Sequence, residues 1–233
     1  MDRDQLAQEL PDQADGLLRF TRTLTRDPQQ AQDLAQETMT RALEHSASFH
    51  GDSGLSTWLH RIAHNLAVDQ SRRKREVPVD ELAESVEALW RNEAYTVDAQ
   101  TVVSRAQQRR KLDEALHRLP VIYRAAVVLH DAEGMTMKQI ADIQNIGLSA
   151  AKQRLRRGRM MLVSELSDDA SLPVGAPVQV LDCWQARSRV SDYMNGSLAD
   201  TERASVEAHL EICPTCPPLY HALVGVRTAL RET

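Results

Sequence analysis

Residues 56–75 run STWLHRIAHNLAVDQSRRKR, and their apolar side chains recur at the spacing of one face of a helix. Ser56 or Thr57 can cap the start of this helix, and four basic residues close it. A basic last turn complements the helix dipole, so charge alone does not distinguish a solvated helix end from a DNA-binding one. We expect Trp58 and Ile62 to lie in a core. The apolar stripe consists of Trp58, Leu59, Ile62, Ala63, Leu66 and Ala67.

The composition of the 233-residue chain is that of a globular, helical protein. Hydrophobic residues make up 42% and charged residues 26%, which excludes general disorder. There are only nine glycines, and good helix formers fill long stretches, so the predicted fold class is all-α. The net charge is −5, so any contact with nucleic acid must come from local basic patches.

The same composition bears on where the protein acts. No apolar run approaches the ~18 residues of a membrane span, and the polar N-terminal stretch does not resemble a signal peptide. The odd count of three cysteines argues against a secreted disulfide scaffold. We therefore expect a cytoplasmic protein with no membrane partner.

Two segments interrupt the helical pattern and divide the chain into three units, 1–75, 102–167 and 181–233. Residues 76–101 hold seven acidic residues and one arginine, and we predict an acidic linker that can contain one short helix. Residues 168–180 contain two prolines and a glycine, which predicts a flexible linker.

The second unit has the pattern of a helix-turn-helix domain. One helix should end before Pro120, a second should run from Tyr123 to His130, and a third, Met137–Gln144, can be capped by Thr136. A glycine-bearing turn leads to a fourth helix at 148–166, which carries five cations in eight residues. A short helix, a tight turn and a longer cationic helix indicate DNA binding.

The third unit contains all three cysteines, in the pattern Cys183-x25-His209-x3-Cys213-x2-Cys216. His209 and Cys213 share one helix face, and the chain can fold back after Pro214 to bring in the other two cysteines. Three thiolates and one imidazole form a closed tetrahedral zinc set. A Cys213–Cys216 disulfide or buried free thiols are the alternatives. Because a closed set leaves no open coordination position, we do not expect a hydrolytic zinc enzyme. No paired carboxylates or nucleophile motif indicate another active site, so we do not expect an enzyme.

The first unit resembles region 2 of bacterial RNA polymerase sigma factors of the extracytoplasmic-function (ECF) group. The resemblance is carried by DLAQETM at 33–39, the glycine-bearing loop and the helix at 57–73. It implies that Asp33, Gln36 and Glu37 dock on the β′ clamp helices of core RNA polymerase. It also implies contacts with the −10 promoter element from Phe49, Arg61, His64, Asn65, Asp69, Arg72 and Arg73. Apart from that role, we expect His60 and His64 to be surface residues rather than metal ligands.

The second unit resembles sigma region 4, through LDEALHRLP, MTMKQIA and AAKQRLRRGR. The resemblance implies a −35 contact from its last helix and binding to the polymerase β flap. Gln153 and Arg154 can read base edges, whereas Arg156 and Arg157 hold phosphates. The family often has Gly-Thr-Val where this chain has Ser-Ala-Ala, so a hydroxyl contact is lost at Ala150. The implied −35 residues are Ala150, Lys152, Gln153, Arg154, Arg156 and Arg157.

The third unit resembles the zinc-finger anti-sigma domain, here fused to the sigma-like units. We therefore expect regulation in cis, by inhibition or by holding the DNA-binding units in a productive arrangement. Oxidation of Cys213 or Cys216 would release the metal. A further regulatory protein is another expected partner. The alternative function is a one-component helix-turn-helix regulator with a metal- or redox-sensing tail, which accounts for 105–166 but not for the region 2 motifs.

Overall fold

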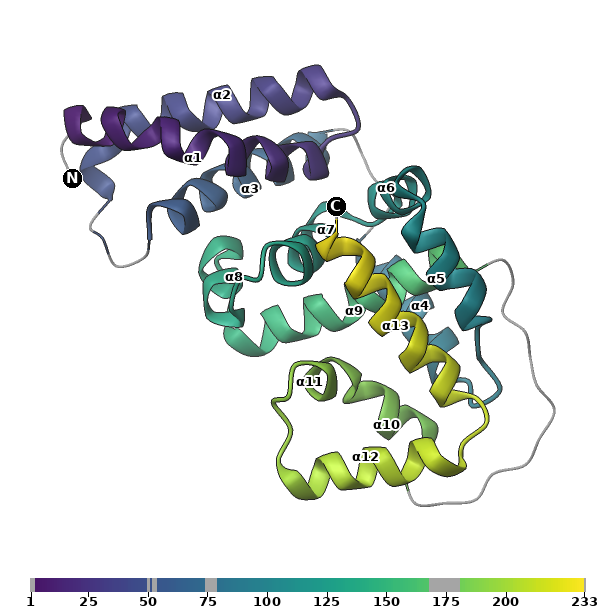
Figure 1. Ribbon diagram of the computed structural model, residues 1–233. Coiled ribbons are helices and arrows are strands. Elements are labelled where there is room, and N and C mark those ends of the chain that lie inside the picture. Colours follow the sequence, from purple (N-terminus) through teal and green to yellow (C-terminus); the bar gives the residue numbers. More distant parts are fainter. Residues whose placement is uncertain (1–2, 50, 52–53, 74–78, 168–180, 233) are drawn as a thin grey trace. The chain divides into compact units, whose positions relative to one another are not determined.

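The regular secondary structure in the described part of the chain is helical, which confirms the all-α class (Figure 1). The structure is a computed structural model that describes residues 3–49, 51, 54–73, 79–167 and 181–232. Its helices are α1 (Arg3–Leu24), α2 (Pro28–Glu44), η1 (Ser46–Ser48), α3 (Leu55–Arg73), α4 (Val79–Arg91), α5 (Ala99–Gln107), α6 (Arg109–Arg118), α7 (Val121–Val127), the π-helical η2 (Val128–Ala132), α8 (Met137–Gln144), α9 (Leu148–Leu166), α10 (Cys183–Ser188), α11 (Val190–Met194), α12 (Asp200–Ile212) and α13 (Cys216–Arg231).

Packing divides the chain into two units. Unit 1 comprises Met1–Glu76 and Pro120–Ala151, and unit 2 comprises Val77–Leu119 and Lys152–Thr233. The division passes through α9 and so differs from the three segments predicted from the sequence. Those segments follow breaks in the helical sequence pattern, whereas the units follow packing, so the predicted boundaries stay predictions.

Unit 1 is built on α1, α2 and α3, and α7, η2 and α8 pack against them. Asp27 caps α2 by accepting a hydrogen bond from the Gln29 backbone N–H at 2.9 Å, and Pro28 fits the first turn because its missing N–H would be unsatisfied there. α3 begins at Leu55, so Ser56 and Thr57 lie inside the helix rather than at its cap.

The expectation that His60 and His64 lie on the surface is wrong. Their exposed fractions are 4% and 3%. The reason is that α3 packs against α7 and α8 as well as against α1 and α2, which leaves little of its circumference open. His60 lies 4.7 Å from the Phe20 ring between ring centroids, and its Nε2 is 3.1 Å from a carboxylate oxygen of Glu133.

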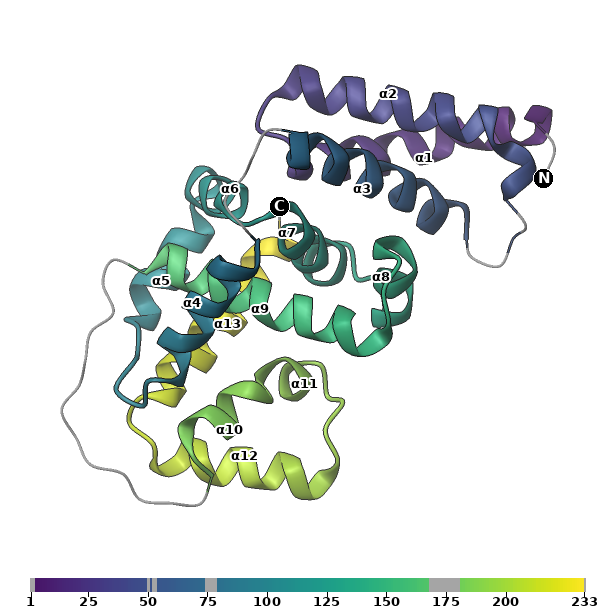
Figure 2. The same ribbon diagram turned by 180° about the vertical axis from the view of Figure 1, so that it is seen from behind.

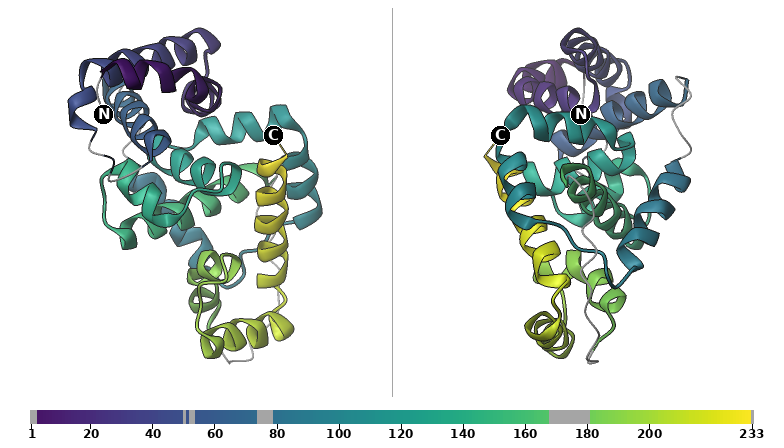
Figure 3. Two further views of the ribbon diagram at one scale, coloured as in Figure 1. Left: turned by 60° about the vertical axis from the view of Figure 1, so that its left-hand side comes forward. Right: turned by 90° about the vertical axis from the view of Figure 1, so that its right-hand side faces the viewer.

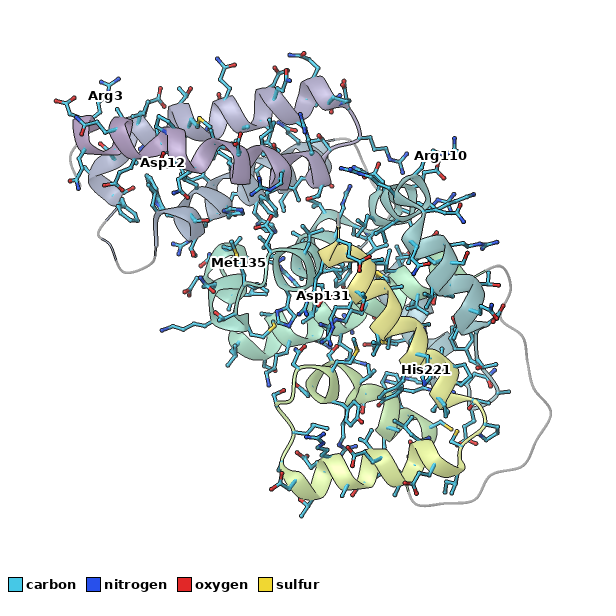
Figure 4. All side chains as sticks on the ribbon, in the orientation of Figure 1. Arg3, Asp12, Arg110, Asp131, Met135 and His221 are labelled. Atoms are coloured by element: carbon cyan, nitrogen blue, oxygen red, sulfur yellow. The ribbon has the colours of Figure 1, made fainter. Side chains whose placement is uncertain are left out.

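The helix-turn-helix forms as predicted. Thr136 caps α8 through a capping box with Gln139, and α8 ends at Asn145 in the left-handed conformation, with φ of 51°. That backbone reversal turns the chain directly into α9. Just before α8, Asp131 lies in η2 and Met135 in the following turn (Figure 4).

Unit 2 corrects the expectation of an acidic linker at 76–101. The described part of this segment forms α4 and the start of α5, and Trp90 and Tyr95 are fully buried. Trp90 Nε1 donates to Ser164 Oγ of α9 at 3.1 Å, and α4 lies against α9 in Figure 2. The acidic residues obscure an amphipathic helix whose apolar face is buried. The linker predicted at 168–180 lies outside the described residues.

The C-terminal helix α13 completes unit 2 by packing along α5 (Figures 1 and 3). The two helices approach each other closely at Gly225 of α13, where an added Cβ would lie 2.2 Å from Cγ2 of Val103 in α5. The apolar face of α13 supplies Leu219, Leu223, Val226 and Leu230 to this core. No described helix combines the length and apolar character needed to cross a bilayer.

Candidate nucleic-acid interface and metal centre

The four predicted metal ligands converge at one point of unit 2. Cys183 opens α10, His209 lies in the last turn of α12, Cys213 follows that helix and Cys216 opens α13. Their ligand atoms all lie within 4.8 Å of one another. The Sγ atoms of Cys183 and Cys213 are 3.7 Å apart, close to the ~3.8 Å between two thiolates on one tetrahedral zinc. All three cysteines are free thiols, so the disulfide alternative is not realised.

His209 has the tautomer that a metal ligand requires. Its Nδ1 lies 2.9 Å from the carbonyl oxygen of Leu181, so Nδ1–H donates there and Nε2 keeps its lone pair. Nε2 is buried and has no hydrogen-bond partner among the described residues. Burial also lowers the pKa of His209, which favours the neutral ring. A buried acceptor beside three thiols fits a zinc ion.

The thiols differ in how readily they ionise. Burial raises the pKa of Cys183 and raises that of Cys216 to about 12. Burial also opposes ionisation of Cys213, but hydrogen bonding with the Thr215 side chain and with the backbone N–H groups of Thr215 and Cys216 outweighs it and lowers its pKa. A bound dication would offset these desolvation costs, because thiolates coordinate metal in the deprotonated form.

The cationic helix α9 is held by acidic groups of its own unit. Lys152 Nζ lies 3.2 Å from Oδ1 of Asp192 in α11. Arg156 Nη2 and Arg157 Nε donate to one carboxylate oxygen of Glu87 in α4, at 2.6 and 2.9 Å. We call Lys152, Arg156 and Arg157 the α9 cations. All three belong to the predicted −35 set, and each has an acidic partner from outside α9.

The Glu87 carboxylate is suited to hold two guanidinium groups. It is 8% exposed. Burial raises its pKa, but the hydrogen bonds and charges of Arg157 and Arg156 outweigh this and leave the pKa below its usual value. The Trp184 ring of α10 adds to the contact, since the guanidinium carbons of Arg91 and Arg156 lie 4.5 and 5.3 Å from its centroid. Side chains from α4 and α10 thus converge on Arg156.

The remaining predicted −35 residues lie nearer the start of α9. Gln153 is exposed, and Ala150 and Arg154 are half-buried. The small Ala150 side chain has no hydroxyl to offer a base or phosphate. Gln153 is therefore the most accessible of the predicted base-reading residues.

The predicted polymerase-binding residues share the open face of α2. Asp33, Gln36 and Glu37 are all exposed, whereas Leu34 and Ala35 between them are buried. This is the alternation expected of a helix with one face on a core and the other available to a partner. Within the helix, Glu37 also forms an ion pair with Arg41 at 2.7 Å.

The predicted −10 residues are divided between surface and core. Burial of His64 removes it from the surface of unit 1. The Phe49 ring lies 5.1 Å from that of Trp58 between centroids, and this packing places Phe49 beside the start of α3. Asn65 and Asp69 are exposed, Arg61 and Phe49 are half-buried, and the side chains of Arg72 and Arg73 lie outside the described part.

Family models match three parts of the chain. Sigma-70 region 2 matches residues 13–77, and Sigma-70 region 4 matches residues 109–162. A zinc-finger family matches residues 183–216, which include all four converging ligands.

Individual sigma factors are also similar to this chain in sequence. The ECF RNA polymerase sigma factor SigW of Bacillus subtilis is 31% identical over 143 residues, which cover 60% of this chain and 76% of that relative. This chain belongs to the ECF RNA polymerase sigma factors. SigE of Mycolicibacterium smegmatis is 30% identical over 158 residues, covering 68% of this sigma factor but only 60% of SigE.

A solved structure agrees in fold. The sigma factor RpoE of Bartonella quintana, crystallised with the anti-sigma factor NepR, aligns with a TM-score of 0.50 and 25% identity. The alignment covers 70% of this sigma factor and 96% of that chain.

The resemblance to known motifs did not reveal the partners of the α9 cations. Glu87, Trp184 and Asp192 lie outside the DNA-binding motifs, and so does Arg187 of α10. One signal was present for Glu87, because Ala83, Glu87 and Trp90 recur at helical spacing. A lone acid on the buried face of a helix indicates a cationic partner, but the sequence does not say which one.

Proposed function

We propose that this sigma factor binds core RNA polymerase and promoter DNA, and that α4 together with the zinc-binding C-terminal part holds it inactive in cis. The first half follows from family membership together with the exposure of the matching residues. The second half rests on a single observation. Each of the α9 cations is bound by an acidic side chain from α4 or α11.

The polymerase contact is assigned to the exposed face of α2. Asp33, Gln36 and Glu37 match the region 2 motif, and nothing in unit 1 buries them. A docking surface for another protein must be open in the free chain, and this face meets that requirement. Core RNA polymerase, through its β′ clamp helices, is the proposed partner.

The DNA contacts are assigned to α9 for the −35 element and to α3 for the −10 element. α9 brings the cations that hold phosphates and the exposed Gln153 that can read a base edge. Asn65 and Asp69 are the exposed members of the predicted −10 set among the described side chains of α3. Burial of His64 means that α3 must lose part of its packing before this side chain reaches DNA.

Inhibition in cis follows from competition for the same donors. The N–H groups of Arg156 and Arg157 that a phosphate oxygen would accept from are already given to Glu87. Carboxylate and phosphate both accept from the guanidinium fork, so the two contacts compete for the same side chains. This favours inhibition over the alternative in which the tail holds the DNA-binding parts in a productive arrangement.

The metal is proposed to be structural. Cys183, His209, Cys213 and Cys216 would hold one zinc ion, which would cross-link α10, α12 and α13 when bound. With four protein ligands the ion has no open position for a substrate. We therefore propose a binding factor without catalytic activity.

The test uses the full-length chain and purified core polymerase. The sigma factor is treated with a chelator, freed of it by desalting, and compared with zinc-loaded protein, so that the metal of the polymerase is untouched. Capture of core enzyme and transcription from a library with randomised −35 and −10 segments are measured. We expect capture, selection of one promoter class, and several-fold more transcription from the metal-free chain. Absence of promoter selection would refute the sigma activity, and a fall after metal removal would refute inhibition.

A further inference from the structure

We propose that Arg187 is the latch by which the metal centre holds α4 against α9. The inference deepens the proposed function, and rests on it only in taking the α4–α9 contact to oppose DNA binding. Arg187 is a positioning residue, because it does not touch the α9 cations. It acts on the helix that carries their acidic partner.

The Arg187 side chain is a fully buried cation whose donors are directed at backbone. Its exposed fraction is 0%. Nη1 donates to the carbonyl oxygens of Trp90 and Asn92, both at 2.7 Å, and Nη2 donates to the carbonyl oxygen of Tyr95 at 2.8 Å. The last carbonyls of a helix have no partner inside it and carry the negative end of its dipole. A buried arginine at this place therefore caps the C-terminus of α4 from another helix.

The same guanidinium also contacts the metal-binding loop. Nε of Arg187 donates to Sγ of Cys216 at 3.2 Å, and Nη2 donates to Oγ1 of Thr215 at 3.1 Å. The Thr215 hydroxyl in turn donates to the carbonyl oxygen of Glu93 at 3.0 Å, and Thr96 Oγ1 donates to the Thr215 carbonyl at 3.1 Å. All five N–H groups of Arg187 thus have acceptors, divided between the metal ligand loop and the end of α4 with the segment that follows it.

The charge on Arg187 explains why the metal ligands matter to α4. No carboxylate is among the acceptors that the structure gives this buried guanidinium. A buried cation is costly unless an anionic or strongly dipolar group compensates it. Cys216 is the only candidate metal ligand in this set, and the other acceptors include the carbonyl dipoles at the end of α4. Arrangement of the ligand loop and capping of α4 are therefore coupled through one side chain.

The end of α4 in turn sets the position of Glu87. This residue lies one helical turn before Trp90, whose carbonyl Arg187 binds. If the cap is lost, the last turns of α4 can fray, and the carboxylate is no longer fixed on Arg156 and Arg157. The path from Cys216 to the α9 cations thus runs through Arg187 and the C-terminal half of α4.

The experiment compares full-length, zinc-loaded Arg187→Gln and Arg187→Lys with wild type. Lysine keeps the charge but has three donors on one nitrogen, so it cannot span the same acceptors. The matched control is Arg203→Gln, which removes an exposed arginine of α12 paired with Glu207 in its own helix. Zinc per chain is quantified for each protein. Hydrogen–deuterium exchange is then followed in peptides covering residues 79–96.

We expect one zinc per chain in all four proteins. Exchange in α4 should be about tenfold or more faster in Arg187→Gln, intermediate in Arg187→Lys and unchanged in Arg203→Gln. Affinity for a mixed-sequence DNA duplex, measured by fluorescence anisotropy at low salt, should increase most in Arg187→Gln and less in Arg187→Lys. It should stay at the wild-type value in Arg203→Gln. Zinc content and duplex affinity together separate a latch from a residue that only supports folding.

Three other outcomes are decisive. If the Arg187 variants keep zinc and α4 exchanges as in wild type, the latch is overturned. If both variants lose zinc, Arg187 supports the metal centre itself, and the latch is again overturned. If α4 exchange accelerates while duplex affinity stays constant, the latch stands and the proposed inhibition in cis fails.

Discussion

Nη2 of Arg156 donates a hydrogen bond to Oε1 of Glu87 over 2.6 Å. Both groups are largely buried and oppositely charged, which makes this a strong charge-assisted bond. The pKa of Glu87 is lowered, so its carboxylate is ionised at neutral pH, and the attraction is lost only as pH falls through that lowered pKa. The contact unites a helix expected to bind DNA with a segment expected to be a linker.

The polymerase surface is tested by reversing charge on α2. Asp33→Lys with Glu37→Lys should abolish capture of core polymerase while leaving the fold intact, because both side chains are exposed and cost about 0.5 kcal/mol or less in stability. Glu44→Lys, at the exposed end of the same helix, is the control and should bind normally. Pull-down and circular dichroism measure the two properties. Normal capture by the double variant would refute the surface.

Base reading at the −35 element is tested at Gln153. Gln153→Ala should change which sequences are selected from a randomised library, because this exposed amide can read a base edge. Lys138→Ala removes an exposed cation of α8 and should leave the preference unchanged. Sequencing of the bound fraction gives both preferences. An identical preference in wild type and Gln153→Ala would count against α9 as the reading helix.

The metal centre is tested by a pair of histidine variants. Wild type should hold one zinc per chain, and His209→Ala should bind it at least about tenfold more weakly. His221→Ala changes an exposed histidine of α13, labelled in Figure 4, and should bind zinc as wild type does. Competition with a chromophoric chelator measures the affinities. Equal affinity in all three proteins would show that His209 is not a ligand.

Close packing of α13 on α5 is tested at Gly225. Gly225→Ala should destabilise unit 2 by about 1–3 kcal/mol, since the new methyl group meets the stiff, β-branched Val103. Gly16→Ala in α1 is the control, because its Cβ would meet only the end of Arg19 at 3.8 Å. That substitution should stabilise α1 by about 1 kcal/mol. Urea unfolding followed by tryptophan fluorescence reports both effects, and a stabilising Gly225→Ala would contradict the packing described here.

The helices around the motifs could be predicted because local signals define them. Thr136 and Asn145 mark the two ends of α8, and Asp27 with Pro28 marks the start of α2. The metal ligands could be predicted for a similar reason. Residue type and spacing restrict a Cys3His set to very few arrangements, and the structure brings all four together.

The partners of α9 could not be predicted, because they depend on packing between distant segments. Glu87 and Arg156 are 69 residues apart, and Arg187 lies 97 residues from Trp90. The acid-rich composition of 76–101 suggested a solvated linker, whereas the burial of Trp90 and Tyr95 outweighs that charge. The burial of His60 and His64 could not be predicted for the same reason, since the helices that cover α3 come from elsewhere in the chain.

We propose that Glu87 occupies the arginine side chains of α9 that would otherwise bind promoter DNA. The most direct test of this proposal is the affinity of full-length, zinc-loaded protein for a mixed-sequence DNA duplex, with Glu87→Gln compared with Glu84→Gln. Glu84 is an exposed residue of the same helix, so both variants change the net charge equally. We predict that Glu87→Gln binds about tenfold more tightly than Glu84→Gln, because it weakens a charge-assisted contact with two arginines. Equal affinities in the two variants would show that Glu87 does not compete with DNA for these arginines.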